Sequence, residues 1–229
     1  MRWPSSSGRW AASSGRRVRP EREADPVRTA AASVIFLVLG IWATCAITGG
    51  FELLTTEQAR RLDISRKQPA VPEIRLIDQS GQAFHFGAWV REENKFLIVD
   101  FIYTNCQSLC RALGSEFQQL QQRIVERGLQ SRVHLLSVSF DPAHDNPAVL
   151  QQYAGHMQAM PDVWTFATVG DARELDALLR TFGVTVIPDR MGGFQHNAAL
   201  IWVAPSGKLV RVTDFDSSDS LLDELTGSN

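Results

Sequence analysis

Residues 96–110 of the chain read FLIVDFIYTNCQSLC, an apolar run that leads directly into two cysteines. Residues 96–103 give the strongest strand signal in the sequence. A helix is predicted over residues 111–127, where the apolar residues recur on one face: Leu113, Phe117, Leu120 and Ile124. Cys106 and Cys110 are therefore expected at the junction of a strand and the helix that follows it.

The spacing of the two cysteines would let both thiols take part in the same reaction or bind the same ion. Positions i and i+4 of a helix share one face, with their Cβ atoms about 5–6 Å apart. Two thiolates so placed can bind one soft metal ion or, after modest adjustment, form a disulfide. The N-terminus of a helix also favours negative charge, and so favours the thiolate form of a nearby cysteine. The alternative is that both cysteines are buried structural residues without a chemical role.

Composition narrows the class of protein. The 229 residues are 44% hydrophobic, which is enough for one domain with a sizeable core, and three cysteines are too few for a disulfide scaffold. Residues 1–29 carry seven arginines against three acidic residues, whereas residues 30–229 carry 16 basic and 22 acidic residues. The mildly acidic main part argues against nucleic acid as a partner.

The first 70 residues divide into three segments. Residues 1–29 are expected to be a disordered, basic cytoplasmic tail, residues 30–48 a transmembrane anchor, and residues 49–70 a linker. The segment 30–48 has no charged residue, and the arginines that precede it predict an N-inside orientation. A cleaved signal peptide, lipidation of Cys45 and a mitochondrial transit peptide are the alternatives. The bacterial plasma membrane is favoured, with the mitochondrial inner membrane as the alternative.

The remaining domain, residues 71–229, alternates strands and helices. A hairpin is predicted over residues 74–86, followed by strands at 133–140 and 163–169, each succeeded by a helix. Two last strands, residues 198–204 and 208–213, precede a final helix. The fold class is thus α/β: a central mixed sheet flanked by helices, with an N-terminal hairpin and the organisation of a thioredoxin-like domain.

Several chemical groups are expected to converge at one edge of this sheet. Ligands of open α/β sheets collect at the carboxyl ends of the strands, where Cys106, Cys110 and Asp141 are predicted. The loop 184–195 leads back to this edge and ends next to His196. Two thiolates and an imidazole suit copper as Cu(I) or Cu(II), whereas a closed zinc site needs a fourth ligand. Asp141 is a candidate to support the ligands, with ordinary turn chemistry as its alternative.

The other polar residues near this edge have simpler interpretations. Asp145 is interpreted as part of the capping of the helix that begins at residues 146–147. His134, His144 and His156 are expected to face solvent. None of them is assigned to the site.

Three segments together resemble the Sco/SenC family of copper proteins. They are residues 100–110 (DFIYTNCQSLC), residues 138–153 (VSFDPAHDNPAVLQQY) and residues 195–209 (QHNAALIWVAPSGKL). The resemblance covers about residues 71–225. It departs from the family pattern at Arg111, where a proline is usual, and at Gln195, where an aspartate is common.

This resemblance implies a thioredoxin-like fold that binds one copper ion through Cys106, Cys110 and His196. It also implies a role in assembling the copper A centre of cytochrome c oxidase, as metallochaperone, thiol reductase or both. The expected partner is subunit II of that enzyme or another copper-accepting oxidase.

Two further functions use the same cysteine pair. A membrane-anchored thiol-disulfide oxidoreductase usually carries CxxC, one residue shorter than the spacing here, and has a cis-proline where this chain has His196. A redox sensor would use the pair without catalysis. The imidazole in place of a proline favours metal binding over both.

Overall fold

The computed structural model describes residues 26–47, 56–105, 109–189, 193–197 and 199–213, together with residues 222, 223 and 225. The chain divides into two compact units, Met1–Phe51 and Glu52–Asn229. The first unit contains helix α1 (Pro26–Ile47), whose apolar side chains are exposed, with Phe36 at 77% and Trp42 at 69%. Among the residues that the structure describes, no helix is both long and apolar enough to cross a membrane.

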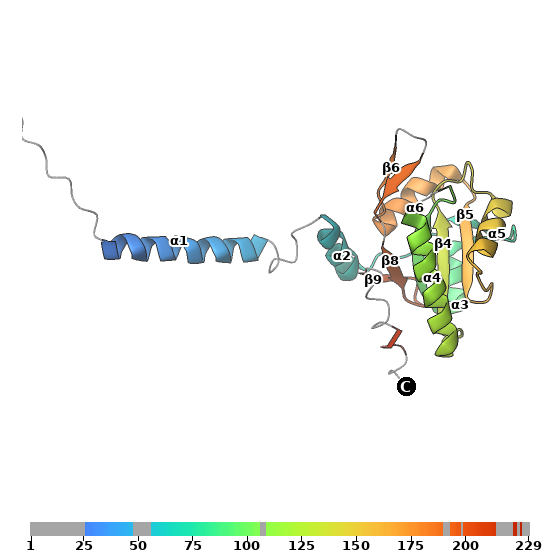
Figure 1. The fold of residues 1–229 in the computed structure, drawn as a ribbon, viewed down its shortest axis with the longest axis horizontal. Coiled ribbons are helices and arrows are strands. Elements are labelled where there is room, and N and C mark those ends of the chain that lie inside the picture. Colours follow the sequence, from blue (N-terminus) through green and yellow to red (C-terminus); the bar gives the residue numbers. More distant parts are fainter. Residues whose placement is uncertain are drawn as a thin grey trace, which may run out of the picture. The chain divides into compact units, whose positions relative to one another are not determined.

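The second unit is built on a seven-stranded mixed sheet with the strand order β2-β1-β5-β4-β3-β8-β9. Strands β4, β5, β8 and β9 of this sheet are labelled in Figure 1. The centre of the sheet consists of three parallel strands: β3 (Phe96–Ile102), β4 (Val133–Ser139) and β5 (Trp164–Val169). These strands are buried along almost their whole length, as the apolar runs predicted.

A hairpin completes the sheet at each edge. The N-terminal hairpin, β1 (Arg75–Asp78) and β2 (Ala83–His85), joins β5 in antiparallel orientation. The C-terminal hairpin, β8 (Leu200–Val203) and β9 (Leu209–Thr213), pairs with β3, also antiparallel. The predicted α/β class and the mixed central sheet are thus confirmed.

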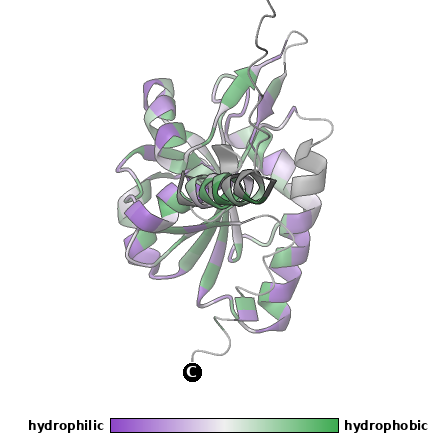
Figure 2. Cartoon of the chain, turned by 90° about the vertical axis from the view of Figure 1, so that its left-hand side faces the viewer, coloured by the Kyte–Doolittle hydropathy of each residue, from purple (hydrophilic) through white to green (hydrophobic). Residues whose placement is uncertain are grey.

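Helices cover both faces of the sheet. One face packs against α2 (Thr56–Lys67), α3 (Phe86–Glu93) and α6 (Leu175–Phe182), and the other against α4 (Leu109–Glu126) and α5 (Pro147–His156). The helices around the sheet carry hydrophobic and hydrophilic residues on different sides (Figure 2). Two apolar cores result, one on each face, because successive residues of a strand point to opposite sides.

Two elements differ from the sequence prediction. Residues 86–93 form helix α3, whereas the predicted hairpin strand extends through Phe86 and no helix is predicted there. The predicted loop 184–195 contains a second, two-stranded sheet, β6 (Val186–Pro188) paired with β7 (Phe194–His196). His196 therefore lies on a strand rather than at the end of a loop.

Local sequence explains the ends of the helices that flank the central strands. The Asn146 side chain caps α5 by accepting hydrogen bonds from the N–H groups of Ala148 and Val149, and Pro147 is its first residue. Helix α6 ends at Gly183, whose φ of 63° is in the left-handed region that glycine tolerates. The start of α5 agrees with the predicted start at residues 146–147.

Candidate metal centre

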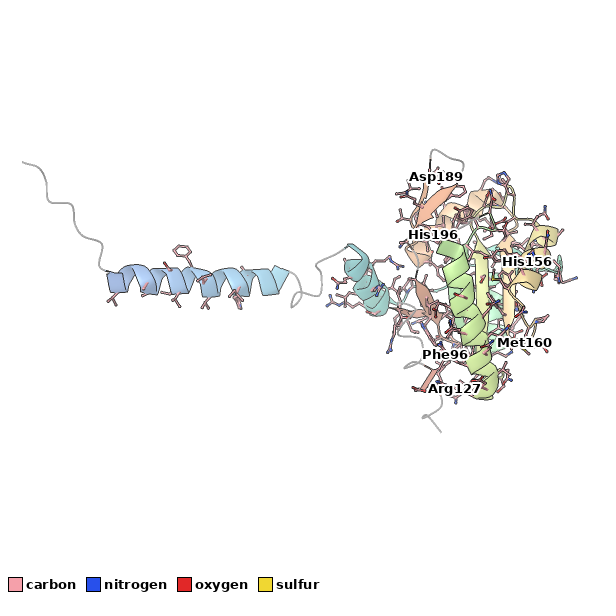
Figure 3. The ribbon with its side chains drawn as sticks, viewed as in Figure 1. Phe96, Arg127, His156, Met160, Asp189 and His196 are labelled. Atoms are coloured by element: carbon pink, nitrogen blue, oxygen red, sulfur yellow. The ribbon has the colours of Figure 1, made fainter. Side chains whose placement is uncertain are left out.

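The carboxyl ends of β3 and β4 form the edge at which the predicted site lies. The two strands are parallel and in register, with Ile102 opposite Ser139. The N–H of Phe140 donates to the carbonyl of Ile102 at 3.0 Å, which keeps the chains together just past the strands. In Figure 3 His196 lies higher than Phe96, the first residue of β3, toward the part of the domain where Asp189 is labelled.

The two cysteines are only partly described. Cys106 lies outside the described residues, and Cys110 is the second residue of α4, where its backbone but not its side chain is described. Cys110 is therefore in the first turn of a helix that follows β3, as the sequence predicted. Within the described residues, no three side chains of His, Cys, Asp or Glu meet as a metal-binding group.

The His196 side chain has no hydrogen-bond partner of normal geometry among the described residues. Its ring lies 5.0 Å from that of Phe140, between ring centroids, which brings it to the carboxyl end of β4. Both ring nitrogens are buried, and neither has a hydrogen-bond partner of normal geometry among the described residues. A buried polar atom without a partner costs free energy, so a further ligand to this imidazole, beyond the described residues, would be favourable.

Burial also sets the charge of this imidazole. Loss of solvent lowers the pKa of His196, and the backbone of Asn197 offsets this only partly. The ring is therefore kept neutral near neutral pH. A neutral imidazole is the form that binds a metal ion, so the pKa shift favours the chemistry that the sequence predicted.

Asp141 lies at the same edge, but its carboxylate is engaged elsewhere. Both of its oxygens lie within hydrogen-bond distance of His144 Nδ1, at 2.9 and 2.8 Å. Asp141 raises the pKa of His144, first through this hydrogen bond and then through its charge. The described contacts of Asp141 do not include His196, so its supporting role remains a prediction.

Asp145 has a structural role that the sequence pattern did not indicate. The pattern placed it in the capping segment of α5, where Asn146 is the cap, but Asp145 is 1% exposed. Its carboxylate accepts hydrogen bonds from the backbone and hydroxyl of Thr104 and from the hydroxyl of Ser139. It thus ties the segment two residues before Cys106 to the end of β4. Thr104 and Asp145 are 41 residues apart, so no local sequence pattern indicates that they interact.

The expectation that His134 faces solvent is wrong. It is 5% exposed, its Nε2 lies 2.8 Å from the Thr165 hydroxyl, and its ring meets Trp89 edge-on at 5.6 Å. Burial, and secondly the charge of Lys95, lower its pKa to about 4. The reason is that β4 is the middle strand of the sheet and is covered on both faces. His144 and His156 are exposed, as predicted.

Most of the second unit matches one family of known proteins. Residues 63–226 match the model of the SCO1/SenC family. This chain belongs to the SCO1/SenC family. The family assignment made from the cysteine, Asp-Pro and histidine segments is thereby confirmed.

The relatives of the chain are distant in sequence. It is 28% identical over 116 residues to the SCO1 protein homolog of Bacillus subtilis, a match that covers 50% of this chain and 59% of the relative. The crystal structure of a SCO1/SenC family lipoprotein from Bacillus anthracis is 20% identical, with a TM-score of 0.62, and the match covers 70% of this chain and 95% of that one. Yeast Sco1 with copper bound is 21% identical, with a TM-score of 0.56 and coverage of 71% and 90%. These likenesses establish the fold.

Proposed function

We propose that this SCO1/SenC protein binds one copper ion through the thiolates of Cys106 and Cys110 and the imidazole of His196. The observation that carries the proposal is the pair of buried ring nitrogens of His196, which make no hydrogen bond of normal geometry with the described residues. They lie at the end of the sheet where β3 leads to Cys106. Copper is supported further by the yeast relative, whose structure holds copper.

The donor set fits both oxidation states of copper. Thiolates are soft ligands that favour Cu(I), and the imidazole extends the set toward Cu(II), which prefers more ligands and nitrogen donors. Cys110 is in the N-terminal turn of α4, and the partial positive charge of a helix N-terminus would favour its thiolate form. The neutral His196 needs no deprotonation before it binds.

The proposed cellular role is assembly of the copper A centre of cytochrome c oxidase. One solved relative is described as a member of the Sco family of cytochrome c oxidase assembly proteins. Two activities of the cysteine pair serve this role. Bound copper can pass to the ligands of subunit II or of another oxidase. Alternatively, the thiolate pair can reduce a disulfide between the acceptor's cysteines, closing its own disulfide as it gives up two electrons.

We also propose that residues 30–48 anchor the protein in the bacterial plasma membrane, with residues 51–229 outside the cytoplasm. The support is the absence of charge across these 19 residues and the seven arginines that precede them. The description of the Bacillus anthracis relative as a lipoprotein supports an extracytoplasmic, membrane-associated domain. A lipid on Cys45 is the alternative attachment, and the mitochondrial inner membrane the alternative location.

Metal analysis of the full-length protein tests the copper proposal. The protein is purified under reducing conditions in detergent, loaded with copper, freed of unbound metal and analysed for copper per chain. About one copper ion per chain is expected. A protein that retains no copper would contradict the proposal and leave thiol-disulfide exchange as the function of the pair.

A further inference from the structure

The hydroxyl of Tyr103 connects the end of β3 to strand β7. It donates a hydrogen bond to the carbonyl of Phe194 and accepts one from the N–H of the same residue, each at 3.3 Å. Tyr103 is three residues before Cys106, and Phe194 is two residues before His196. The Tyr103 side chain therefore connects the segment that leads to Cys106 with the segment that carries His196.

Aromatic packing fixes the ring of Tyr103 in this place. Its centroid lies 5.3 Å from that of Phe140 and 5.2 Å from that of Phe194. Phe140 in turn meets Phe194 at 5.5 Å and His196 at 5.0 Å. These ring contacts are apolar packing, which holds the two segments together but does not fix their relative orientation as a hydrogen bond does. The hydroxyl adds the directional contact, because it bonds both backbone polar groups of one residue of β7.

Tyr103 contacts β7 where no strand of the seven-stranded sheet pairs with it. In the described part of the chain, β7 pairs with β6 alone and not with the seven-stranded sheet. A two-stranded hairpin is marginally stable by itself, so its position depends on what its sides contact. Tyr103 supplies such a contact at Phe194, on the strand that carries His196.

We propose that Tyr103 is a positioning residue for the copper site: its hydroxyl holds β7 where His196 reaches the ion bound by the two cysteines. This inference rests on the proposed copper function. Because Cu(II) depends on the imidazole more than Cu(I) does, loss of the hydroxyl affects the two oxidation states unequally. Tyr103 touches no copper itself and acts through the backbone of Phe194.

The Tyr103→Phe variant removes the hydroxyl and keeps the ring. We expect its affinity for Cu(II) to fall roughly three- to tenfold, the effect of one hydrogen bond of ordinary strength. Its affinity for Cu(I) should stay within about twofold of wild type. The chain has two tyrosines, which provides a matched control: Tyr153 lies on α5, packs on Phe166 at 5.7 Å and belongs to the core on the other face. Tyr153→Phe should leave both affinities unchanged.

Anaerobic Cu(I) competition and Cu(II) titration, followed by the thiolate-to-copper charge-transfer band, are measured on the full-length protein in detergent. His196→Ala is measured alongside to separate this inference from the proposed function. If His196→Ala weakens Cu(II) binding and Tyr103→Phe does not, the positioning role is overturned and the copper site stands. If the wild-type protein binds no copper, both are overturned.

Amide exchange tests the contact without relying on a metal. In the wild-type protein the Phe194 amide should exchange slowly, since its N–H is bonded to Tyr103. In Tyr103→Phe it should exchange roughly three- to tenfold faster, while amides in the central strands stay unchanged. Exchange of the wild-type Phe194 amide at the rate of an open chain would overturn the inference, even if the variant failed to fold.

Discussion

The carboxylate of Asp145 accepts two hydrogen bonds from Thr104, one from its backbone N–H at 3.0 Å and one from its hydroxyl at 2.5 Å. A third comes from the hydroxyl of Ser139 at 2.6 Å. This buried carboxylate therefore fixes the turn after β3 against the end of β4. The proposed copper ligand Cys106 follows two residues later, so its backbone starts from a constrained position.

Replacing Asp145 by asparagine should loosen this turn. The amide keeps the shape but loses the charge, and its NH2 group cannot accept from Thr104 or Ser139. We expect the free energy of unfolding to fall by about 1–3 kcal/mol, and copper affinity to fall with it. Urea unfolding and copper titration measure the two effects.

Asp176→Asn, at an exposed position of α6, is the matched control for this change. It should alter neither quantity by more than the error of the measurement. An Asp145→Asn protein as stable as wild type, and with wild-type copper affinity, would show that the turn before Cys106 is held by other contacts.

Asp100 predicts an unusual dependence of stability on pH. Asp100 lies in the middle of β3 and is 2% exposed. Burial raises its pKa to about 7, and a side-chain hydrogen bond with Ser137 offsets part of this rise. The protonated carboxyl of Asp100 is uncharged and is the form that the buried site favours. Its contribution to the free energy of unfolding is therefore complete below about pH 4 and is lost as the pH rises to about 7. Asp100→Asn should therefore stabilise the protein at pH 8 by about 3 kcal/mol more than at pH 5.

Urea unfolding of wild type and Asp100→Asn at these two pH values gives this difference directly. Other titrating groups, including His134, cancel because both proteins contain them. An equal effect of the substitution at pH 5 and pH 8 would mean that Asp100 ionises normally in the folded protein.

Much of this fold could be predicted because its strands are fully buried. Apart from Asp100, the run at residues 96–102 is apolar on both faces, as expected for the centre of a covered sheet, and the following helix shows one apolar face. The capping signal Asn146-Pro147 predicted a helix start that the structure confirms. The family assignment rested on segments with these features and is correct.

What the sequence did not show depends on contacts between distant residues. Helix α3 is only eight residues long, so its periodicity is too short to outweigh the strand-like alternation before it. His134 is buried because of the position of β4 in the sheet order, which its own neighbours do not encode. Asp145 and Tyr103 act through partners 41 and 91 residues away. Local patterns carry no information about such pairs.

The thiol pair should link copper binding to redox state. We expect Cys106 and Cys110 to form a disulfide on oxidation, and neither to pair with Cys45. A disulfide sulfur is no longer an anionic ligand, so the oxidised protein should not bind copper tightly until it is reduced. Mass mapping under non-reducing conditions and copper titration before and after reduction test this. Tight copper binding by the fully oxidised protein would argue against the thiolate site.

The proposed anchor predicts the side of the membrane on which the domain lies. With residues 1–29 inside and residues 30–48 spanning, a reporter fused after Asn229 should lie outside the cytoplasm. A reporter that is active only in the periplasm should therefore be active in this fusion. A reporter active only in the cytoplasm should be silent, and its activity at the same position would refute the orientation.

The cysteine ligands are the control for the central claim about the copper site. Cys106→Ser or Cys110→Ser should abolish tight binding of both Cu(I) and Cu(II), because a single thiolate no longer forms the soft pair. These variants show what loss of the whole site looks like in the same titrations.

The affinity of His196→Ala for the two oxidation states of copper tests the claim most directly. Cu(I) is satisfied by the two thiolates, so its affinity should fall only modestly. Cu(II) needs the imidazole, so its affinity should fall by at least about tenfold and its thiolate charge-transfer band should change. Wild-type affinity of His196→Ala for both ions would remove His196 from the site and contradict the account.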